Sequence, residues 1–264
     1  MEKLISLKIK ETKECYQTIK KIGGGGFGEV FIAKDLKNNQ ESGLQDRLVA
    51  LKVQKLSELC DCNDKQLSQS MLRLFREIFC IQLSHPNIVQ VHESFFSYDG
   101  NFVIVSELAR ENLFQYVNKK GAGNLPINQI AFIMLDIISG LEYVHQNNII
   151  HRDISPQNIL VMDDNTFKIC DFGIATYGDN TQISGGKSNY MAPEMYQMTK
   201  NYDKTIDIWS LGVILYFLCT GESQINDIPL HFAKNITGQN IDLPEQYNIF
   251  QEMLNIILSL DSKQ

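Results

Sequence analysis

The sequence predicts an α+β protein with a small β-rich first lobe and a larger, mainly helical second lobe. The first half alternates strand-like runs with one helical segment, from about Asp64 to Leu83. The second half consists mostly of helical patterns such as "NQIAFIMLDIISGLEYVHQNN". With 264 residues and 44% hydrophobic composition, the chain is long enough to bury the core that two lobes need.

Composition and charge exclude several classes of partner. A net charge of -7 gives no general attraction for nucleic acid or anionic lipid, so we expect no nucleic-acid partner. The longest apolar run, Ile208 to Cys219, is shorter than the ~20 residues that cross a bilayer, and it predicts a buried helix rather than a membrane span. Six cysteines without a secretory signal predict reduced thiols in the cytoplasm. Cys60 and Cys62 lack a second Cys/His pair at zinc-site spacing, so we expect no zinc there.

The strand-like runs of the first lobe are "YQTIKKIG", "EVFIAKD", "LVALKVQ" and "NFVIVSEL". The first two flank "IGGGGFGEV", which places Gly23, Gly25 and Gly28 at G-x-G-x-x-G spacing. Glycines let backbone amides approach phosphate oxygens because no Cβ intervenes. Dinucleotide-binding folds share this spacing, but they need a helix directly after the glycines, whereas a β-branched strand follows here. The pattern therefore favours a hairpin over a nucleotide.

Lys52 interrupts an apolar strand, where a purely structural charge resists burial. We expect its side chain to point toward phosphate and to pair with Glu77, which lies on the helical segment. The alternative for Glu77 is an ordinary exposed surface residue.

The second lobe carries two acidic motifs. "HRDISPQN" contains Asp153 and Asn158, and "KICDFGIA" contains Asp171. Two carboxylates and an amide can hold Mg²⁺ and orient a hydroxyl, which is most of what phosphoryl transfer requires.

Together with "GGKSNYMAPE", which ends at Glu194, and "DIWSLGVILY", which begins at Asp207, these motifs resemble the eukaryotic protein kinase family. The resemblance runs in the family's order from Ile22 to Leu260. It implies a two-lobed protein kinase fold in which an antiparallel β lobe with one helix (1–107) precedes a mainly helical lobe (108–264). It also implies ATP-dependent phosphoryl transfer to protein substrates.

The resemblance also assigns roles to residues. Lys52, paired with Glu77, would hold the α- and β-phosphates of ATP, and Asn158 and Asp171 would bind Mg²⁺. Asp153 would orient and deprotonate the substrate hydroxyl. The other positions expected around ATP are Ile22, Gly23, Gly25, Gly28, Val30, Ala50, Ser106, Glu107, Ala109 and Leu160. A stacked column would contain Ile81, Val91, His151 and Phe172, with Asp207 at its base.

The chain departs from the family at three places. Ser155 stands where the family has a lysine that touches the transferring phosphate, and Lys187 stands where it has a threonine that bonds this lysine and the catalytic aspartate. We expect an exchange, in which Lys187 reaches into the site, stabilises charge on the γ-phosphoryl group and holds Asp153, while Ser155 takes over the threonine's hydrogen bonds. The alternative is a solvated Lys187 and slow or lost catalysis. The sequence also stops where the family's ion-pair arginine for Glu194 would appear, which predicts a truncated domain without its last helices.

Two functions are compatible with these motifs: an active kinase, or a pseudokinase that binds nucleotide or partners. Positions 155 and 157 lack the arginine common in tyrosine kinases, which favours serine or threonine acceptors in protein substrates. Arg152 predicts control by phosphorylation of the 174–190 loop, by an activating kinase or by autophosphorylation. The candidate acceptors are Thr176, Thr181 and Ser184. Ser106 predicts an open pocket behind adenine.

Overall fold

The fold is described from a computed structural model. The described residues are 9–10, 12–25, 28–36, 47–56, 64–178, 185–196, 201–225, 228–230 and 241–259. The chain divides into two compact units: unit 1 is Met1–Ser84 with Val89–Ala109, and unit 2 is His85–Ile88 with Arg110–Gln264. The division thus falls after Ala109 rather than after Glu107, and the short segment His85–Ile88 belongs to unit 2.

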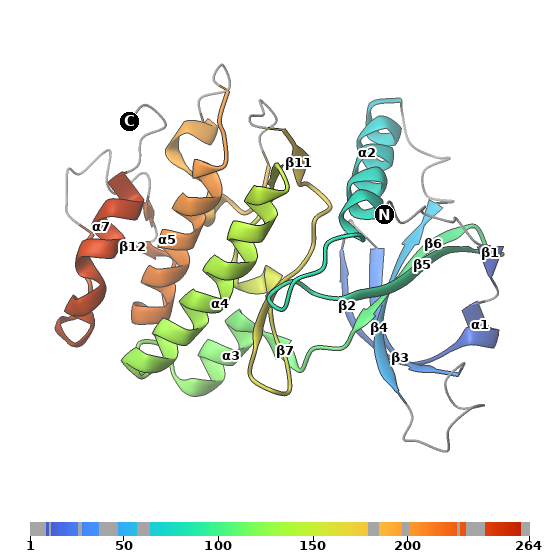
Figure 1. The fold of residues 1–264 in the computed structure, drawn as a ribbon, viewed down its shortest axis with the longest axis horizontal. Helices are drawn as coiled ribbons and strands as arrows, with labels where there is room; N and C mark the ends of the chain where they lie inside the picture. Colours follow the sequence, from blue (N-terminus) through green and yellow to red (C-terminus); the bar gives the residue numbers. More distant parts are fainter. Residues whose placement is uncertain are drawn as a thin grey trace. The chain divides into compact units, whose positions relative to one another are not determined.

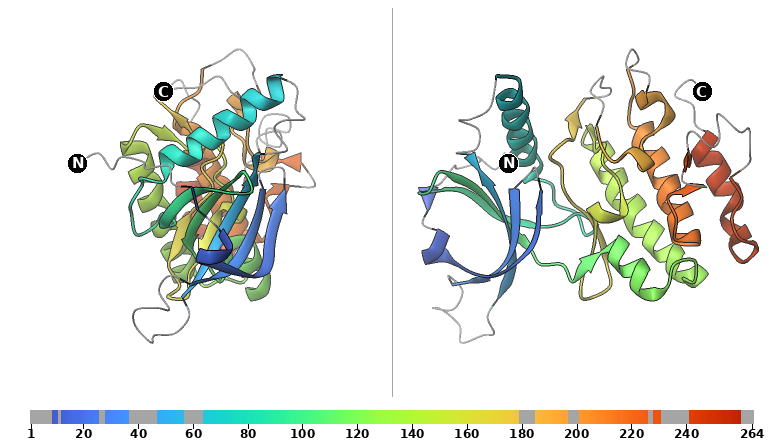
Figure 2. Two further views of the ribbon diagram at one scale, coloured as in Figure 1. Left: turned by 90° about the vertical axis from the view of Figure 1, so that its right-hand side faces the viewer. Right: turned by 180° about the vertical axis from the view of Figure 1, so that it is seen from behind.

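Unit 1 is built on a six-stranded sheet with the order β1-β5-β6-β4-β3-β2 (Figures 1 and 2). Only β1 pairs in parallel, with β5; the other described pairings are antiparallel. A short helix, α1 (Thr12–Cys15), joins β1 to β2. The strands are β1 (Ile9–Lys10), β2 (Tyr16–Gly25), β3 (Gly28–Asp35), β4 (Leu48–Lys55), β5 (Val91–Ser97) and β6 (Asn101–Glu107).

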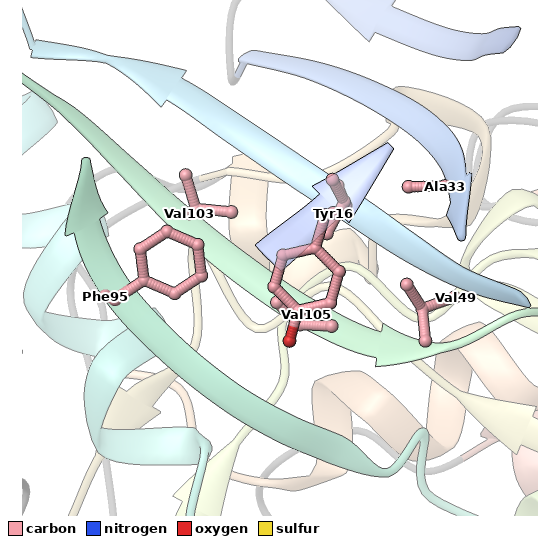
Figure 3. Close-up of a cluster of buried hydrophobic side chains, with 7 residues drawn as sticks. Tyr16, Ala33, Val49, Phe95, Val103 and Val105 are labelled. Carbon is pink, nitrogen blue, oxygen red and sulfur yellow. The ribbon is translucent and has the colours of Figure 1, made fainter. Parts of the chain in front are cut away.

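One face of this sheet forms a buried apolar cluster (Figure 3). The rings of Tyr16 and Phe95 stack with centroids 6.1 Å apart, and the Tyr16 hydroxyl donates to Glu93 Oε1 at 2.5 Å. Burial and the Glu93 carboxylate raise the pKa of Tyr16. The cluster as a whole contains Tyr16, Ala33, Val49, Leu51, Phe95, Val103 and Val105.

The long helix α2 (Asp64–Cys80) of unit 1 packs against the opposite face of the sheet. Its Leu74 is buried with Phe102 and Ile104 of β6. Side chains of a strand alternate between faces, so β4 directs Val49 and Leu51 to the first cluster and Ala50 and Lys52 to the face that α2 partly covers. The apolar side of α2 thus faces the sheet of unit 1.

Unit 2 is mainly helical, and Figure 1 shows α4, α5 and α7 running side by side within it. Its helices are α3 (Leu113–Lys120), α4 (Ile127–Gln146), α5 (Thr205–Thr220) and α7 (Gln251–Ser259). Short 3-10 turns are η3 (Pro156–Asn158), η4 (Ser188–Tyr190), η5 (Pro193–Tyr196) and η6 (Glu245–Phe250). The strands are β7 (Glu111–Asn112), β8 (Ile149–Ile150), β9 (Ile159–Val161), β10 (Phe167–Ile169), β11 (Thr176–Tyr177), β12 (Gln224–Ile225) and β13 (Ile228–Pro229).

Helix α5 is the core of unit 2, as its apolar sequence predicts. Its residues from Ile206 to Cys219 are buried except Ile208. A Cβ on Gly212 would lie 2.5 Å from Ile257 Cγ2, so this glycine lets α7 pack closely against α5. Helix α4 is long and apolar enough to cross a bilayer by length and composition, a test that core helices of globular proteins also pass.

Candidate active site

Lys52 and Glu77 form an ion pair within unit 1. Lys52 Nζ lies 2.8 Å from Glu77 Oε1, and only 5% of the Glu77 side chain is exposed. The pair joins β4 to α2, and a carboxylate this deeply buried needs a cation beside it. Glu77 is therefore not the exposed surface residue of the alternative interpretation.

Several residues expected near ATP share the sheet face of Lys52. Directly opposed residues of antiparallel strands have side chains on one face, and the pairs are Val30 with Lys52 and Ala50 with Ser106. Glu107 follows Ser106, and its backbone N–H donates to Gln90 O at 3.1 Å. Ile22 projects from β2 and is exposed. Val30, Ala50 and Ser106 thus place small or apolar side chains on the same face as Lys52.

The glycine-rich segment forms a hairpin, since β2 and β3 pair with Gly23 opposite Val30 and Gly25 opposite Gly28. A strand, not a helix, follows the glycines, as expected. Gly28 has φ +109°, and a Cβ there would lie 2.4 Å from Val53 O. Glycine is therefore required at position 28 by the neighbouring strand, whatever the hairpin binds.

In unit 2, the buried carboxylate of Asp207 fixes the turn that carries the "HRDISPQN" motif. It accepts the backbone N–H of His151 at 2.8 Å and that of Arg152 at 2.7 Å. His145 Nε2 lies 2.9 Å from the same carboxylate. Arg152 has φ +70°, a left-handed conformation that non-glycine residues adopt only when their surroundings enforce it. His151 is fully buried with its ring edge-on to Phe172, which is a packing role.

Asp153, two residues after His151, is held from two sides. Asn158 Nδ2 donates to Asp153 Oδ2 at 2.7 Å and to the Asp153 carbonyl at 2.8 Å. Lys187 donates its backbone N–H to Oδ1 at 3.1 Å and its Nζ to Oδ2 at 2.9 Å. The Asp153 side chain nonetheless keeps 17% of its surface exposed. The carboxylate is therefore oriented and still accessible.

The hairpin of β9 and β10 brings Asn158 and Asp171 to the same end. Ile159 pairs with Ile169, and Cys170 N–H donates to the Asn158 carbonyl at 2.9 Å. Asp171, the next residue, has φ +64°, a strained conformation of the kind that clusters at functional sites. Leu160 lies in the same hairpin and is half-buried.

One expectation about unit 2 is wrong. Ser155 does not take over the threonine's hydrogen bonds: its Oγ is buried and has no partner among the described residues. The reason is that Asn158 and Lys187 already supply the donors to both oxygens of Asp153. Glu194, for which the usual ion-pair arginine is expected to be missing, is buried and has an interaction partner in this chain.

The other expected positions are placed as follows. The Arg152 guanidinium donates to Thr176 Oγ1 at 2.8 Å and to the Ile174 carbonyl at 2.9 Å. Thr181, Ser184, Cys60 and Cys62 lie outside the described residues. Within the described part of the chain, no group of three His, Cys, Asp or Glu residues is placed to hold a metal ion.

Sequence reasoning missed Gly186, which has φ +104°. A Cβ on this residue would lie 2.4 Å from Arg152 O. The glycine pair in "GGKSNY" was the available signal, because adjacent glycines mark a backbone that must approach another chain segment closely.

A sequence model of the protein kinase domain matches residues 16–263. The chain belongs to the protein kinase family. The carbon catabolite-derepressing protein kinase of Candida tropicalis is 34% identical over 231 residues, which cover 84% of this chain and 34% of that protein. Serine/threonine-protein kinase 36 of Mus musculus is 37% identical over 214 residues, covering 79% and 15%. Serine/threonine-protein kinase TIO of Arabidopsis thaliana is 34% identical over 244 residues, covering 90% and 17%. This kinase chain thus spans about a third or less of the length of these relatives.

Proposed function

We propose that this chain is the catalytic domain of an ATP-dependent protein serine/threonine kinase. The observation that carries the proposal is the seating of Asp153, whose carboxylate is oriented by Asn158 and Lys187 yet remains accessible. Such a carboxylate is suited to accept a proton from an incoming hydroxyl. Membership of the protein kinase family and the names of the relatives support the same reaction.

In the proposed reaction, the substrate hydroxyl oxygen attacks the γ-phosphorus of ATP. A bond forms between this oxygen and phosphorus, and the bond from phosphorus to the β–γ bridging oxygen breaks. The leaving electron pair stays on ADP, and the hydroxyl proton passes to the Asp153 carboxylate. Lys52, held by Glu77 at 2.8 Å, is the group that we assign to the α- and β-phosphates.

The residues present fit a magnesium site. Asn158 uses its Nδ2 on Asp153, which leaves the amide oxygen for a cation, and Asp171 offers a carboxylate at the same end of the hairpin. Mg²⁺ bound there would neutralise charge on the phosphates of ATP. Gly23, Gly25 and Gly28 are the backbone positions that we assign to covering these phosphates. The apolar side chains assigned to adenine are Ile22, Val30, Ala50 and Leu160, with backbone of Glu107 and Ala109 at its edge.

Serine and threonine acceptors are favoured because Ser155 and Gln157 stand where tyrosine kinases commonly place arginine. The intact Lys52–Glu77 pair and the oriented Asp153 favour a catalyst over a pseudokinase.

A cytoplasmic location is supported by the four described cysteines, none of which forms a disulfide. Control by phosphorylation of the 174–190 loop is supported by Arg152, whose guanidinium already contacts Thr176 in that loop.

Phosphotransfer from labelled ATP to a degenerate serine/threonine peptide library tests the proposal. The parent chain should label peptides, and Asp153→Asn should lower the rate at least ~100-fold, because proton acceptance is lost. Asp163→Asn is the matched control, since Asp163 is an exposed aspartate in the same unit, and it should leave the rate unchanged. Trace labelling that Asp153→Asn leaves unaltered would refute the proposed function.

A further inference from the structure

The cation nearest the candidate base does not come from the loop that carries the base. Lys187 contacts both oxygens of the Asp153 carboxylate, through its backbone N–H at 3.1 Å and its Nζ at 2.9 Å. Lys187 follows Asp153 by 34 residues in the sequence, in a separate segment. The side chain of Lys187 remains 37% exposed, so the ammonium group can contact a ligand while it holds Asp153.

The backbone around Lys187 is held on both sides. On the preceding side, Gly186 runs against Arg152 so closely that a Cβ would lie 2.4 Å from Arg152 O. On the following side, Tyr190 N–H donates to the Lys187 carbonyl at 2.9 Å. Ser210 Oγ of α5 donates to the Tyr190 carbonyl at 2.7 Å and so ties this turn to the core helix of unit 2. The position of Lys187 is therefore built by close packing and hydrogen bonds.

Within the catalytic loop itself, position 155 offers no cation. Ser155 is fully buried, and its Oγ has no hydrogen-bond partner among the described residues. In the described part of the chain, Lys187 is the residue that forms an ion pair with Asp153. The cation that lies beside Asp153 thus comes from the later segment.

We infer that Lys187 is the catalytic cation that stabilises charge on the γ-phosphoryl group, and that Gly186 is the positioning residue that delivers it. The inference rests on the proposed function. The cation is carried by residues 185–187 and not by the catalytic loop. Displacement of this segment would therefore remove the cation and both contacts of Lys187 to Asp153.

The first test changes the charge. Lys187→Met should lower kcat about ten- to a thousandfold with little change in the affinity for ATP, since an interaction made only in the transition state affects kcat. Lys187→Arg should retain more activity than Lys187→Met because it keeps a cation. Lys119→Ala is the matched control: Lys119 is also ion-paired, with Glu111 at 2.6 Å, and its loss should leave kcat unchanged.

The second test moves the cation back. Ser155→Lys combined with Lys187→Thr should restore kcat to within about tenfold of the parent, whereas Lys187→Thr alone should not. If Lys187→Met transfers phosphate as fast as the parent, the inference is wrong. If it loses activity but the double variant and Lys187→Arg recover none, Lys187 serves only the fold and the inference is likewise wrong.

The third test addresses positioning. Gly186→Ala should lower kcat at least ~10-fold at unchanged ATP affinity, because the added Cβ pushes the segment away from Arg152. Gly178→Ala is the control, since Gly178 has φ +118° but nothing lies within 4 Å of its added Cβ. Equal kcat for Gly186→Ala and Gly178→Ala would show that Gly186 does not position Lys187.

Parallel measurements separate the inference from the proposed function. Thermal unfolding and ATP affinity of every variant show whether the fold and the nucleotide site remain. If phosphate transfer by the parent chain does not depend on Asp153, the proposed function fails. If transfer depends on Asp153 and the Lys187 variants transfer phosphate as fast as the parent, only the inference fails.

Discussion

Asn158 Nδ2 lies 2.7 Å from Asp153 Oδ2, so the amide that we assign to magnesium also orients the candidate base. One residue thus links two functions, and its two polar atoms have different tasks. The nitrogen faces Asp153, and the oxygen is left for a cation.

Asn158→Asp should therefore damage the site although it keeps an oxygen for magnesium. The new carboxylate would replace a donor by a like charge at hydrogen-bond distance from Asp153, so the two groups would repel each other. We expect phosphotransfer to fall at least ~100-fold. Asn165→Asp, in the exposed turn between β9 and β10, is the control and should retain the parent rate. Parent-like transfer by Asn158→Asp would show that the amide does not orient Asp153.

A second prediction concerns stability. Asp207 is fully buried and accepts two backbone N–H groups, from His151 and Arg152. Asp207→Ala leaves both donors without their acceptor, and each such loss costs ~1–3 kcal/mol, so the free energy of unfolding should fall by ~2–6 kcal/mol. Urea unfolding measures this loss. Asp163→Ala, an exposed aspartate of the same unit, should change it by less than ~0.5 kcal/mol. A similar small change in Asp207→Ala would contradict the anchoring role.

Much of the fold could be predicted because periodicity and glycine placement are local signals. The runs that became β2, β3, β4 and β6 and the buried helix α5 were all visible in the sequence. Strand β5 was not, since "VHESFFS" interrupts its apolar residues with polar ones. It is nonetheless paired on both sides, by β1 and β6, which is a long-range property.

The candidate site, like the fold, could be predicted only in part. The pairing of Lys52 with Glu77 was expected from the sequence, and the resemblance to the protein kinase family led us to expect Lys187 beside Asp153. It did not indicate that Asn158 would also donate to Asp153, because this depends on how the chain turns between these two residues. Ser155 was assigned hydrogen bonds that it does not make for the same reason.

A third prediction concerns pH. Arg47 Nη2 lies 2.8 Å from His92 Nε2, and an arginine can only donate, so His92 must be neutral to accept. Burial, followed by the Arg47 charge, lowers the pKa of His92. A histidine whose pKa is lower in the folded than in the unfolded chain binds more protons when the chain is unfolded. Neutral His92 therefore contributes to the stability of the fold above its unfolded pKa, and this contribution is lost as the pH falls below ~6.5.

His92→Gln tests this dependence because glutamine can still accept from Arg47 but does not titrate. Between pH 7.5 and pH 5, values chosen to lie about one unit or more on either side of ~6.5, the parent should lose more thermal stability than the variant. The difference should appear mainly below ~6.5. Identical pH profiles for the two proteins would show that His92 contributes nothing to acid sensitivity.

The last prediction concerns inhibitors. Ser106 pairs directly with Ala50 across β6 and β4, and both side chains are small, on the sheet face that also carries Lys52. If this face receives adenine, as the proposed function requires, two small neighbours leave space for an extra apolar group. ATP-competitive compounds with a bulky substituent should therefore bind this chain tightly. Ser106→Met should weaken them at least tenfold, or ~1.4 kcal/mol, while the affinity for ATP itself changes little.

Cys80→Ser, a change at a buried residue of α2, controls for general loosening of unit 1. Competition binding with a matched pair of compounds, with and without the substituent, measures the effect. Equal affinity of the substituted compound for the parent and for Ser106→Met would rule out the open space beside Ser106.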